Sequence, residues 1–567
     1  MEIKPPPPPE FDVEFWKQQP YGERLRMMCV NWTMQGFGVP LITYVFYAVK
    51  IVLYLGGFLF FVTVGEPNLH VSNIGDWWAS PIAFQKAILW TFLYEGLGLG
   101  CASGPLTGRY NPPITAVAHW VRPGTLRLPP WPGRIPFTAG DTRTPIDVAL
   151  YLAVVVTTVR ALFSAQMHVD TILPIIIAAG LLGLRDKVSF LCHRSEHYLV
   201  TAAVFMFPVT EMWAGAKWIQ AMLWIFAGMS KLNRHFPTVI AIMLSNHAFL
   251  RSRWFKRQLY VSYPTDLRPS KLALVIAHSS TFVELVMPIV LVLSDGGWPT
   301  YVALVLVTAL HANIFFSIPM GVPLEWNLMF AYGAWVLFGN HAEVRVWDID
   351  SPALWAILIV CTLVVPLWGN FRPGDASFLW TMRYYAGNWA NSMWICKPGT
   401  LDRVDDALVT AAPSQRRQFE AMYDPELVER DIYPIIVGKM HVFRSMHLHG
   451  RAINSLMPRA LAGIPGAHLD DYEVMDGEVF VGMALGWNFG DGHFGHEQFL
   501  EALQRRCNFE PGEVRTIFLE SQPLHTEWMD WRILDPAVGV VETGKIHVSE
   551  FANRQPWEID AAVAGPR

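Results

Sequence analysis

Charged residues are scarce in this sequence of 567 residues, and that scarcity excludes several classes of protein. Only 16% of the residues are charged, while 52% are hydrophobic, whereas a soluble protein carries about 25% charged residues. The formal net charge is −5, and no basic stripe is present, which excludes a nucleic-acid-binding surface. The charge deficit falls within residues 39–370, whereas residues 371–567 have an ordinary soluble mixture. This asymmetry predicts a multi-pass membrane region followed by a soluble domain.

Paired cysteines, a secretory signal peptide and a glycine-rich phosphate loop are also missing. The six cysteines are scattered singly, so neither a disulfide framework nor a zinc knuckle is expected. The first residues hold five consecutive prolines, which favour a stiff polyproline II arm, and no apolar signal segment follows them. Residues 1–38 are therefore predicted to form a proline-rich arm that approaches the membrane interface through its aromatic side chains.

Long apolar runs predict an all-α membrane bundle of about ten spans within residues 39–370. The runs cover residues 39–64, 82–103, 146–164, 171–185, 197–213, 216–230, 272–294, 299–319, 325–339 and 352–370. A full crossing needs about 20 apolar residues, so the shorter runs are expected to be tilted or half-membrane pieces. Lysine and arginine are concentrated in the loops at 104–145 and 231–271. The positive-inside rule then predicts a plasma-membrane protein with both termini in the cytoplasm.

The C-terminal part is predicted to be a soluble α+β domain over residues 395–567, reached through an aromatic linker, residues 371–394, on the membrane surface. The segment HEQFLEALQRR has the apolar spacing of an amphipathic helix. The segments VRTIFLESQPL and WRILDPAVGVVETGKIHVSEF alternate in the manner of strands joined by a glycine-containing turn.

Ionisable residues within the predicted spans indicate a polar cavity inside the membrane region. Each such residue costs about 2.5–3.5 kcal/mol at the centre of a bilayer. A single one has a simple explanation, since a lysine at a helix end snorkels and a histidine–glutamate pair can merely fix packing. Here they recur across consecutive spans: Glu95, His193, Glu196, His197, Glu211, Lys217, Lys231, His278, Glu284, His311, Asn313, Glu325 and Asn327.

Four blocks in this region resemble the membrane core of vitamin K-dependent gamma-carboxylase, within the horizontally transferred transmembrane (HTTM) superfamily. The blocks are EHYLVTAAVF, WIFAGMSKLNRHFPTVIAIMLSNHAFL, HSSTFVELVMPIVLVL and LHANIFFSIPMGVPLEWNLMF, and their order agrees with that family. The whole chain, including MRYYAGNWANSMW, also resembles an actinobacterial family of multi-pass membrane proteins of unknown function.

The resemblance implies roles for three residues. Lys231 matches the lysine that acts as the family's base, His197 matches a histidine of the carboxylation half-reaction, and His311 matches a histidine of the later block. A lysine at the end of a dry helix loses stabilisation of its ammonium form, and enzymes can lower such a pKa to about 7–8. The departures count against glutamate carboxylation, because Ser230 replaces the first lysine of a pair and the charge pattern places Lys231 on the cytoplasmic side.

The histidines allow two metal-based readings. His193, Glu196 and His197 match the His-x-x-Glu-His pattern of a zinc protease, if the segment is helical. A His-box oxygenase or desaturase would need further boxes, for which His441, His447, His449, His493 and His496 are available in the C-terminal part. These histidines are more simply explained as polar surface residues, and His193 with Arg194 as interfacial polarity at a helix start. No metal ligand and no cofactor is therefore assigned.

Two functions of different classes follow. The first is a membrane enzyme that transfers protons on a lipophilic substrate, such as a quinone, prenyl or acyl lipid, with Lys231, His197, His311, Glu284 and His278 as its site. The second is a non-enzymatic lipid-handling or scaffold protein whose soluble domain binds a protein partner, while the basic run RSRWFKR binds anionic headgroups. A metal oxygenase is a minor third reading. The lipid bilayer is the expected partner in every case.

Overall fold

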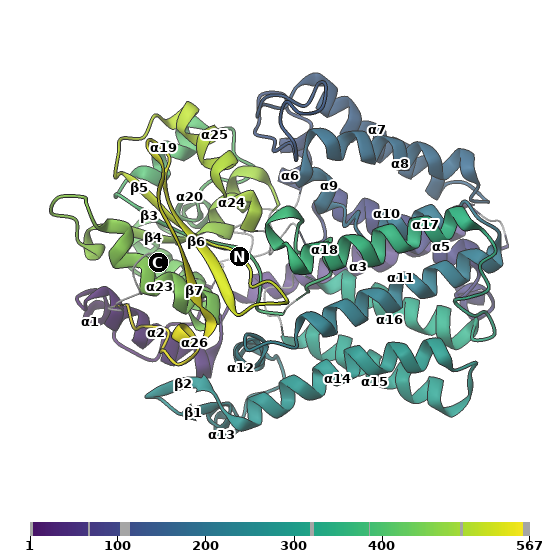
Figure 1. The fold of residues 1–567 in the computed structure, drawn as a ribbon, viewed down its shortest axis with the longest axis horizontal. Coiled ribbons are helices and arrows are strands. Elements are labelled where there is room, and N and C mark those ends of the chain that lie inside the picture. The colour runs from purple at the N-terminus through teal and green to yellow at the C-terminus, as the bar shows by residue number, and fades with distance from the viewer. Residues whose placement is uncertain are drawn as a thin grey trace.

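The computed structural model shows a mostly helical protein with a bundle of long helices at one end and a β-sheet at the other (Figure 1). It describes residues 4–65, 68–101, 114–317, 323–384, 386–487 and 492–559. Residues 104–113 of the first basic loop and Tyr385 of the segment MRYYAGNWANSMW lie outside the described residues.

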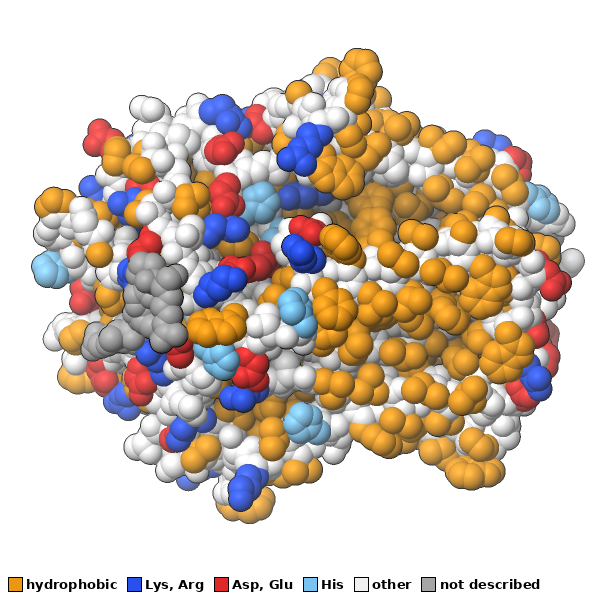
Figure 2. All heavy atoms as spheres, in the orientation of Figure 1, with side chains coloured by type: hydrophobic (Ala, Val, Ile, Leu, Met, Phe, Trp, Pro, Cys, Tyr) orange, Lys and Arg blue, Asp and Glu red, His pale blue; other side chains and the backbone are white. Residues whose placement is uncertain are grey.

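Five helical segments are long and apolar enough to cross a membrane, judged by length and composition. They are α3 (Leu41–Gly65), α7 (Pro145–Leu162), α14 (Lys271–Leu293), α15 (Gly297–Ser317), and the continuous run of α17 (Pro352–Ile359), η4 (Val360–Val364) and α18 (Val365–Phe371). Only 22–33% of each apolar stretch is buried inside the protein. These segments therefore turn most of their apolar surface outward, and Figure 2 shows the resulting continuous apolar surface over the helical half of the molecule.

Shorter or more polar helices lie among these five. They are α5 (Pro81–Gly96), α8 (Val169–Arg185), α9 (Lys187–Cys192), α10 (Tyr198–Val204), α11 (Val209–Ser230), α12 (Phe236–Asn246) and α16 (Leu324–Ala334), which continues as η3 (Trp335–Asn340). The expected count of about ten spans is not confirmed. Helix α11 is long enough but carries Glu211 and Lys217, while α5 has only 16 residues, nearly all buried by neighbouring helices.

The sheet has five antiparallel strands in the order β4-β3-β5-β6-β7. The strands are β3 (Asn391–Cys396), β4 (Glu473–Asp476), β5 (Val514–Leu519), β6 (Trp528–Asp535) and β7 (Gly539–His547). The sequence prediction of β5, β6 and β7 is confirmed, and β7 begins at the expected turn glycine, Gly539, whose φ of 92° suits only glycine. The other two strands were not predicted.

Helices cover the sheet and join it to the bundle. They include α22 (Tyr433–Met446), α23 (Leu448–Leu461) and α24 (Gly477–Leu485), together with the predicted amphipathic helix, confirmed as α25 (Glu497–Cys507). The smaller ones are α19 (Thr400–Ala407), α20 (Gln415–Glu420), α21 (Pro425–Leu427) and α26 (Val548–Ala552), with the single turns η5 (Pro373–Asp375), η6 (Val428–Ile432), η7 (Leu469–Asp471) and η8 (Gly492–Phe494).

The N-terminal segment is part of this sheet-bearing end. After α1 (Val13–Lys17), helix α2 (Tyr21–Gln35) packs against α22 and α12. The Tyr21 hydroxyl lies 2.8 Å from the ring nitrogen Nδ1 of His441. Helices α1 and α26 lie at the same end of the molecule (Figure 1). The remaining short elements are η1 (Val71–Asn73), α4 (Ile74–Trp77), α6 (Ile114–Trp120), α13 (Arg253–Gln258) and the β1–β2 ribbon (Tyr260–Ser262, Asp266–Pro269).

The aromatic stretch expected to lie on the membrane surface is instead largely internal. Leu379, Met382 and Trp389 are buried, and the following strand β3 is buried along its whole length between β4 and β5. The apolar composition of this stretch thus reflects packing between the bundle and the sheet, an interface that residue types alone do not distinguish from a lipid surface.

Candidate functional site

The structure joins two of the predicted residues, Lys231 and Glu284, in a buried ion pair. Lys231 ends α11, and Glu284 lies in the middle of α14, which packs alongside α11. The Lys231 ammonium donates to both carboxylate oxygens of Glu284, and the two side chains are 4% and 5% exposed. The ammonium also lies 5.2 Å from the ring centre of Phe236. This pair is the centre of the candidate site.

The close approach of the two helices depends on Gly228, one turn before Lys231. A Cβ atom at this position would lie 2.8 Å from Leu285 Cγ and 3.1 Å from Glu284 Cβ, closer than packed carbons come. The sequence alone predicted that the Lys231 ammonium loses stabilisation at the end of a dry helix. In the structure Glu284 supplies that charge stabilisation. The candidate group for the expected proton transfer is thus the pair rather than the lysine alone.

His311, on α15, is held in one protonation state by its neighbours. The indole N–H of Trp224 donates to His311 Nε2 at 3.0 Å, so this nitrogen carries no proton. Nδ1 lies 2.9 Å from the amide oxygen of Asn327, whose NH₂ group donates to the Pro323 carbonyl at 2.7 Å. The hydrogen-bond network therefore assigns a neutral His311 with its proton on Nδ1.

His197 is connected to His311 through aromatic rings rather than hydrogen bonds. The ring of Phe330 lies 4.8 Å from that of His197 and 5.6 Å from that of His311. The ring of Trp326 lies 5.5 Å from that of His197 on another side. Within the described residues, His197 Nδ1 has no hydrogen-bond partner. His197 thus lines the same aromatic core as His311 and keeps one polar atom unused.

The pattern His-x-x-Glu-His does not form the zinc motif that a helix would create. Helix α9 ends at Cys192, the chain turns through residues 193–197, and Arg194 adopts a left-handed φ of 55°. His193 Nδ1 donates to the Ser189 carbonyl at 2.5 Å. Glu196 instead accepts from Arg194 Nε at 2.8 Å and from the Tyr384 hydroxyl at 2.9 Å. The two histidines therefore do not share a helix face.

Arg194 is a buried residue that the sequence argument treated as interfacial. Its guanidinium lies 3.8 Å from the ring centre of Trp326 and 5.2 Å from that of Tyr384. Tyr384 belongs to the MRYYAG segment, more than 180 residues away in the sequence. The clue in the sequence was an arginine beside a glutamate at the start of an apolar run, but its distant aromatic partners could not be located from residue types.

Close to Arg194, three further side chains form a buried cluster. The ligand atoms of Glu95, Cys101 and Glu325 all lie within 4.8 Å of one another, and all three residues are buried. Among the described residues this is the one group of three or more His, Cys, Asp and Glu side chains with metal-binding spacing. The two glutamates were recognised as costly polar residues, but nothing in the sequence linked them to each other or to Cys101.

His278 lies outside the buried pair, on the wall of an open groove of ≈ 570 Å³ between the bundle and the sheet. We call this the junction groove; its lining residues are Leu232, Asn233, Arg234, His278, Gln522, Leu524, His525, Thr526 and Glu527. Leu232 and Asn233 directly follow Lys231, and His278 precedes Glu284 by six residues on α14. The groove therefore borders the two segments that carry the ion pair.

The histidines of the C-terminal part were expected on a polar surface, but three of them, His441, His447 and His449, are buried. The rings of His447 and His449 stack at 5.3 Å, and Trp389 packs against both. Burial, reinforced by the positive charge of Arg444, lowers the pKa of His447 to about 3. His493 is partly exposed and lies 3.0 Å from Glu520. None of these residues lies within metal-binding distance of two others, as far as the described residues go.

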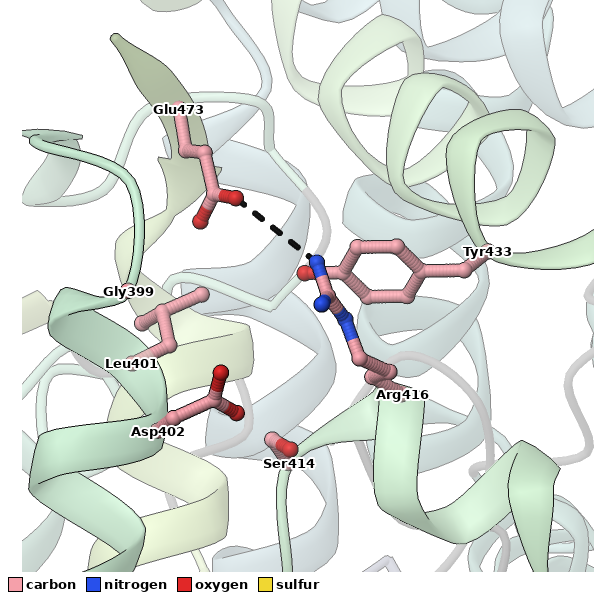
Figure 3. Close-up of a pocket in the computed structure, with 7 residues that line it drawn as sticks. All are labelled: Gly399, Leu401, Asp402, Ser414, Arg416, Tyr433 and Glu473. Atoms are coloured by element: carbon pink, nitrogen blue, oxygen red, sulfur yellow. Dashed lines mark ion pairs between the residues drawn. The ribbon is translucent and has the colours of Figure 1, made fainter. Parts of the chain in front are cut away.

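The sheet-bearing end also has a small pocket, in which the Arg416 guanidinium stacks on the ring of Tyr433 at 4.8 Å (Figure 3). Arg416 Nη2 lies 3.8 Å from the carboxylate of Glu473 across this pocket. The cavity volume is ≈ 10 Å³, which is room for about one water molecule. The pocket therefore cannot hold an organic substrate in this conformation.

Comparison with known proteins places the chain in a family without assigning an activity. A family model described as "Transmembrane protein of unknown function (DUF3556)" matches residues 1–565. No curated protein and no solved structure matches the sequence. The resemblance to the gamma-carboxylase membrane core therefore stays a prediction.

Proposed function

The chain belongs to this family of transmembrane proteins, and we propose that it is a membrane enzyme that transfers protons on a lipophilic substrate at the Lys231–Glu284 pair. The observation that carries the proposal is the pair itself, an ammonium and a carboxylate buried together beside apolar spans. Ionisable groups at such positions are expensive and are retained mainly for function. A quinone, prenyl or acyl lipid is the substrate class that reaches such a site from the bilayer.

The junction groove supports access to the pair. Exposed Leu232 and Leu524 offer apolar contact at its wall, and Arg234 and His278 offer polar contact. A lipid with a polar head can therefore rest in the groove while its reacting group approaches the end of α11. His278 then contacts the polar head, while His311 and His197 bound the aromatic core behind the pair.

The chemistry needs only proton movements within the pair and between the pair and the substrate. Transfer of one proton from the Lys231 ammonium to the Glu284 carboxylate gives a neutral amine and a neutral acid, which an apolar site tolerates better than separated charges. The amine then accepts a proton from a substrate hydroxyl or an acidic C–H group. The resulting ammonium returns the proton to another atom of the substrate, so a rearranged substrate leaves and the pair is restored. Neutral His311 is already a hydrogen-bond donor through Nδ1 and acts as a fixed dipole beside this step.

The test compares lipid extracts from cells that lack the protein and cells that express it or its variants. We expect Lys231→Met and Glu284→Gln to reproduce the lipid profile of cells without the protein, as determined by mass spectrometry. Lys217→Met is the matched control, because Lys217 is equally buried but its ammonium binds main-chain carbonyls such as that of His341 at 2.8 Å. If both site variants are inserted and restore the wild-type profile, the proposal is wrong and the scaffold function gains support.

We further propose that the sheet-bearing end lies in the cytoplasm and that the protein resides in the plasma membrane. Basic residues gather at that end of the helices, including Arg253, Lys256 and Arg257 on α13. The opposite loops, such as the one between α14 and α15, carry acidic Asp295. This distribution follows the positive-inside rule.

A further inference from the structure

The cluster of Glu95, Cys101 and Glu325 brings side chains that can bind a metal ion from three segments of the chain to one buried point. Glu95 lies at the end of α5, Cys101 follows it by six residues, and Glu325 opens α16. The Cys101 thiol lies 3.5 Å from Glu325 Oε1, and the Cys101 main-chain N–H donates to Glu95 Oε2 at 2.8 Å. The fold thus brings two carboxyl groups and a sulfur close together.

Glu95 has a polar atom that its protein neighbours do not satisfy. Glu95 is fully buried, and its Oε1 has no hydrogen-bond partner among the described residues. A buried carboxylate oxygen without a partner is costly, because the charge has lost its water without replacement. An unsatisfied carboxylate oxygen in a cluster of metal-binding side chains indicates that a ligand binds to the cluster.

Gly100 leaves the space in which the two carboxylates meet. A Cβ atom at this position would lie 2.1 Å from Glu95 Oε2 and 2.8 Å from Glu325 Oε1. Any other residue would therefore displace both carboxylates. The main chain at Gly100 is itself anchored, because its carbonyl accepts from Lys50 Nζ at 3.0 Å.

The nearby Arg194 makes its ion pair with Glu196 rather than with the two carboxyl groups of the cluster. Arg194 donates through Nε to Glu196 and stacks on Trp326, so its charge is already paired. Its Nη1 lies 3.6 Å from the Cys101 sulfur, which accepts a hydrogen bond from the guanidinium. Two carboxyl groups and a sulfur that converge in an apolar interior can hold a divalent cation between them once they are ionised.

We propose that Glu95, Cys101 and Glu325 bind a divalent transition-metal ion of the zinc type. Zinc–sulfur and zinc–oxygen bonds of about 2.3 and 2.0–2.2 Å place neighbouring ligand atoms about 3.3–3.8 Å apart. The observed spacing, 3.5 Å for the sulfur–oxygen pair and below 4.8 Å throughout, needs only small side-chain adjustments. A thiolate ligand selects zinc over magnesium or calcium, which prefer oxygen alone.

Three protein ligands leave one tetrahedral position open, as in catalytic rather than structural zinc sites. Arg194 then serves as the outer hydrogen-bond donor to the thiolate, the kind of contact that orients metal ligands. The inference goes beyond the proposed function, because the metal site does not involve Lys231 or Glu284.

The test measures metal binding by the full-length protein purified in detergent. After removal of metals with a chelator, we expect Zn²⁺ to rebind at about one ion per chain, measured by mass spectrometry of the metal content. Co²⁺ should give a thiolate charge-transfer band in the near ultraviolet. Cys101→Ser should abolish this band. Cys101→Ser and Glu325→Gln should each weaken Zn²⁺ binding by more than about tenfold, because the loss of an outer contact to a metal ligand already costs about that much.

Matched controls separate the site from general damage. Cys192→Ser replaces an equally buried cysteine and should retain both the metal and the cobalt band, as should Lys231→Met. Size-exclusion chromatography verifies that each variant remains folded. The proposal is overturned if the wild-type protein binds no Zn²⁺, or if the folded variants bind it as tightly as the wild type. The first outcome would mean that the two carboxyl groups share a proton instead.

Discussion

A buried ion pair such as that of Lys231 and Glu284 can serve chemistry or packing. At the scale of single residues, substitutions distinguish these two roles. Removing one partner leaves the other charge buried alone, whereas replacing both by apolar residues is often neutral for stability. Stability and function therefore respond differently to single and double substitutions, and that difference identifies the role of the pair.

Lys231→Met is expected to lower the free energy of unfolding by about 3–5 kcal/mol, because Glu284 loses its counter-charge. The double variant Lys231→Met with Glu284→Leu should return to within about 1 kcal/mol of the wild type. Denaturant unfolding in detergent measures both, with exposed Lys271→Met as the control. The lipid profile should stay defective in the double variant. Recovery of the profile together with stability would show that the pair is only structural.

The buried histidines of the sheet-bearing end lead to a pH prediction. Burial lowers the pKa of His441 to about 4, and burial with the Arg444 charge lowers that of His447 to about 3. In the unfolded chain these groups take up protons near pH 6.5. The unfolded state therefore binds more protons below that pH, so stability falls as the pH drops from about 6.5 towards 3.

His447→Gln should reduce this acid sensitivity by up to about 1.4 kcal/mol per pH unit, the effect of one proton. Glutamine retains an N–H donor for the Phe443 carbonyl, which His447 Nδ1 contacts at 2.7 Å. Intrinsic tryptophan fluorescence, to which Trp389 beside the His447 ring contributes, reports the unfolding at each pH. Exposed His468→Gln is the control. An unchanged pH slope in His447→Gln would contradict the argument.

At the scale of elements, the contact between α11 and α14 determines whether the ion pair forms. Gly228→Ala should force the helices apart, because its Cβ would come within 2.8 Å of Leu285. Overpacking of this kind costs about 1–3 kcal/mol. Gly180→Ala on α8, where nothing lies within 4 Å, should be neutral or stabilising by up to about 1 kcal/mol. Thermal unfolding in detergent compares the two. Equal effects would mean that the α11–α14 contact is not tight.

How far the sequence predicts each element depends on where its contacts lie. Apolar length is enough for α3 or α14, whose surface faces lipid, and alternation with a turn glycine is enough for β6 and β7. Helices α5 and α11 carry polar residues that other helices cover, so their position cannot be deduced from composition. The spacing of His193, Glu196 and His197 is compatible with a helix, so the pattern alone did not reveal the turn at residues 193–197, where Arg194 has a left-handed φ.

At the scale of the whole molecule, the candidate site was only partly predictable for the same reason. Lys231 and Glu284 were selected because charge is rare in apolar segments, and the structure brings them together. Cys101 was not singled out and Arg194 was interpreted as interfacial, because a single cysteine and an arginine near a helix end are common in sequences. Their significance comes from Glu95, Glu325 and Trp326, which only the folded chain places beside them.

The orientation of the molecule in the membrane follows from the same charge pattern and can be tested on the intact chain. Trp298, at the start of α15, is 77% exposed at the end away from the sheet. Arg251, before α13, is exposed at the sheet-bearing end. If the sheet is cytoplasmic, an impermeant maleimide should label Trp298→Cys in intact cells. Arg251→Cys should be labelled only after the membrane is permeabilised, because the basic end stays inside. The reverse pattern would place the sheet and the junction groove outside the cell.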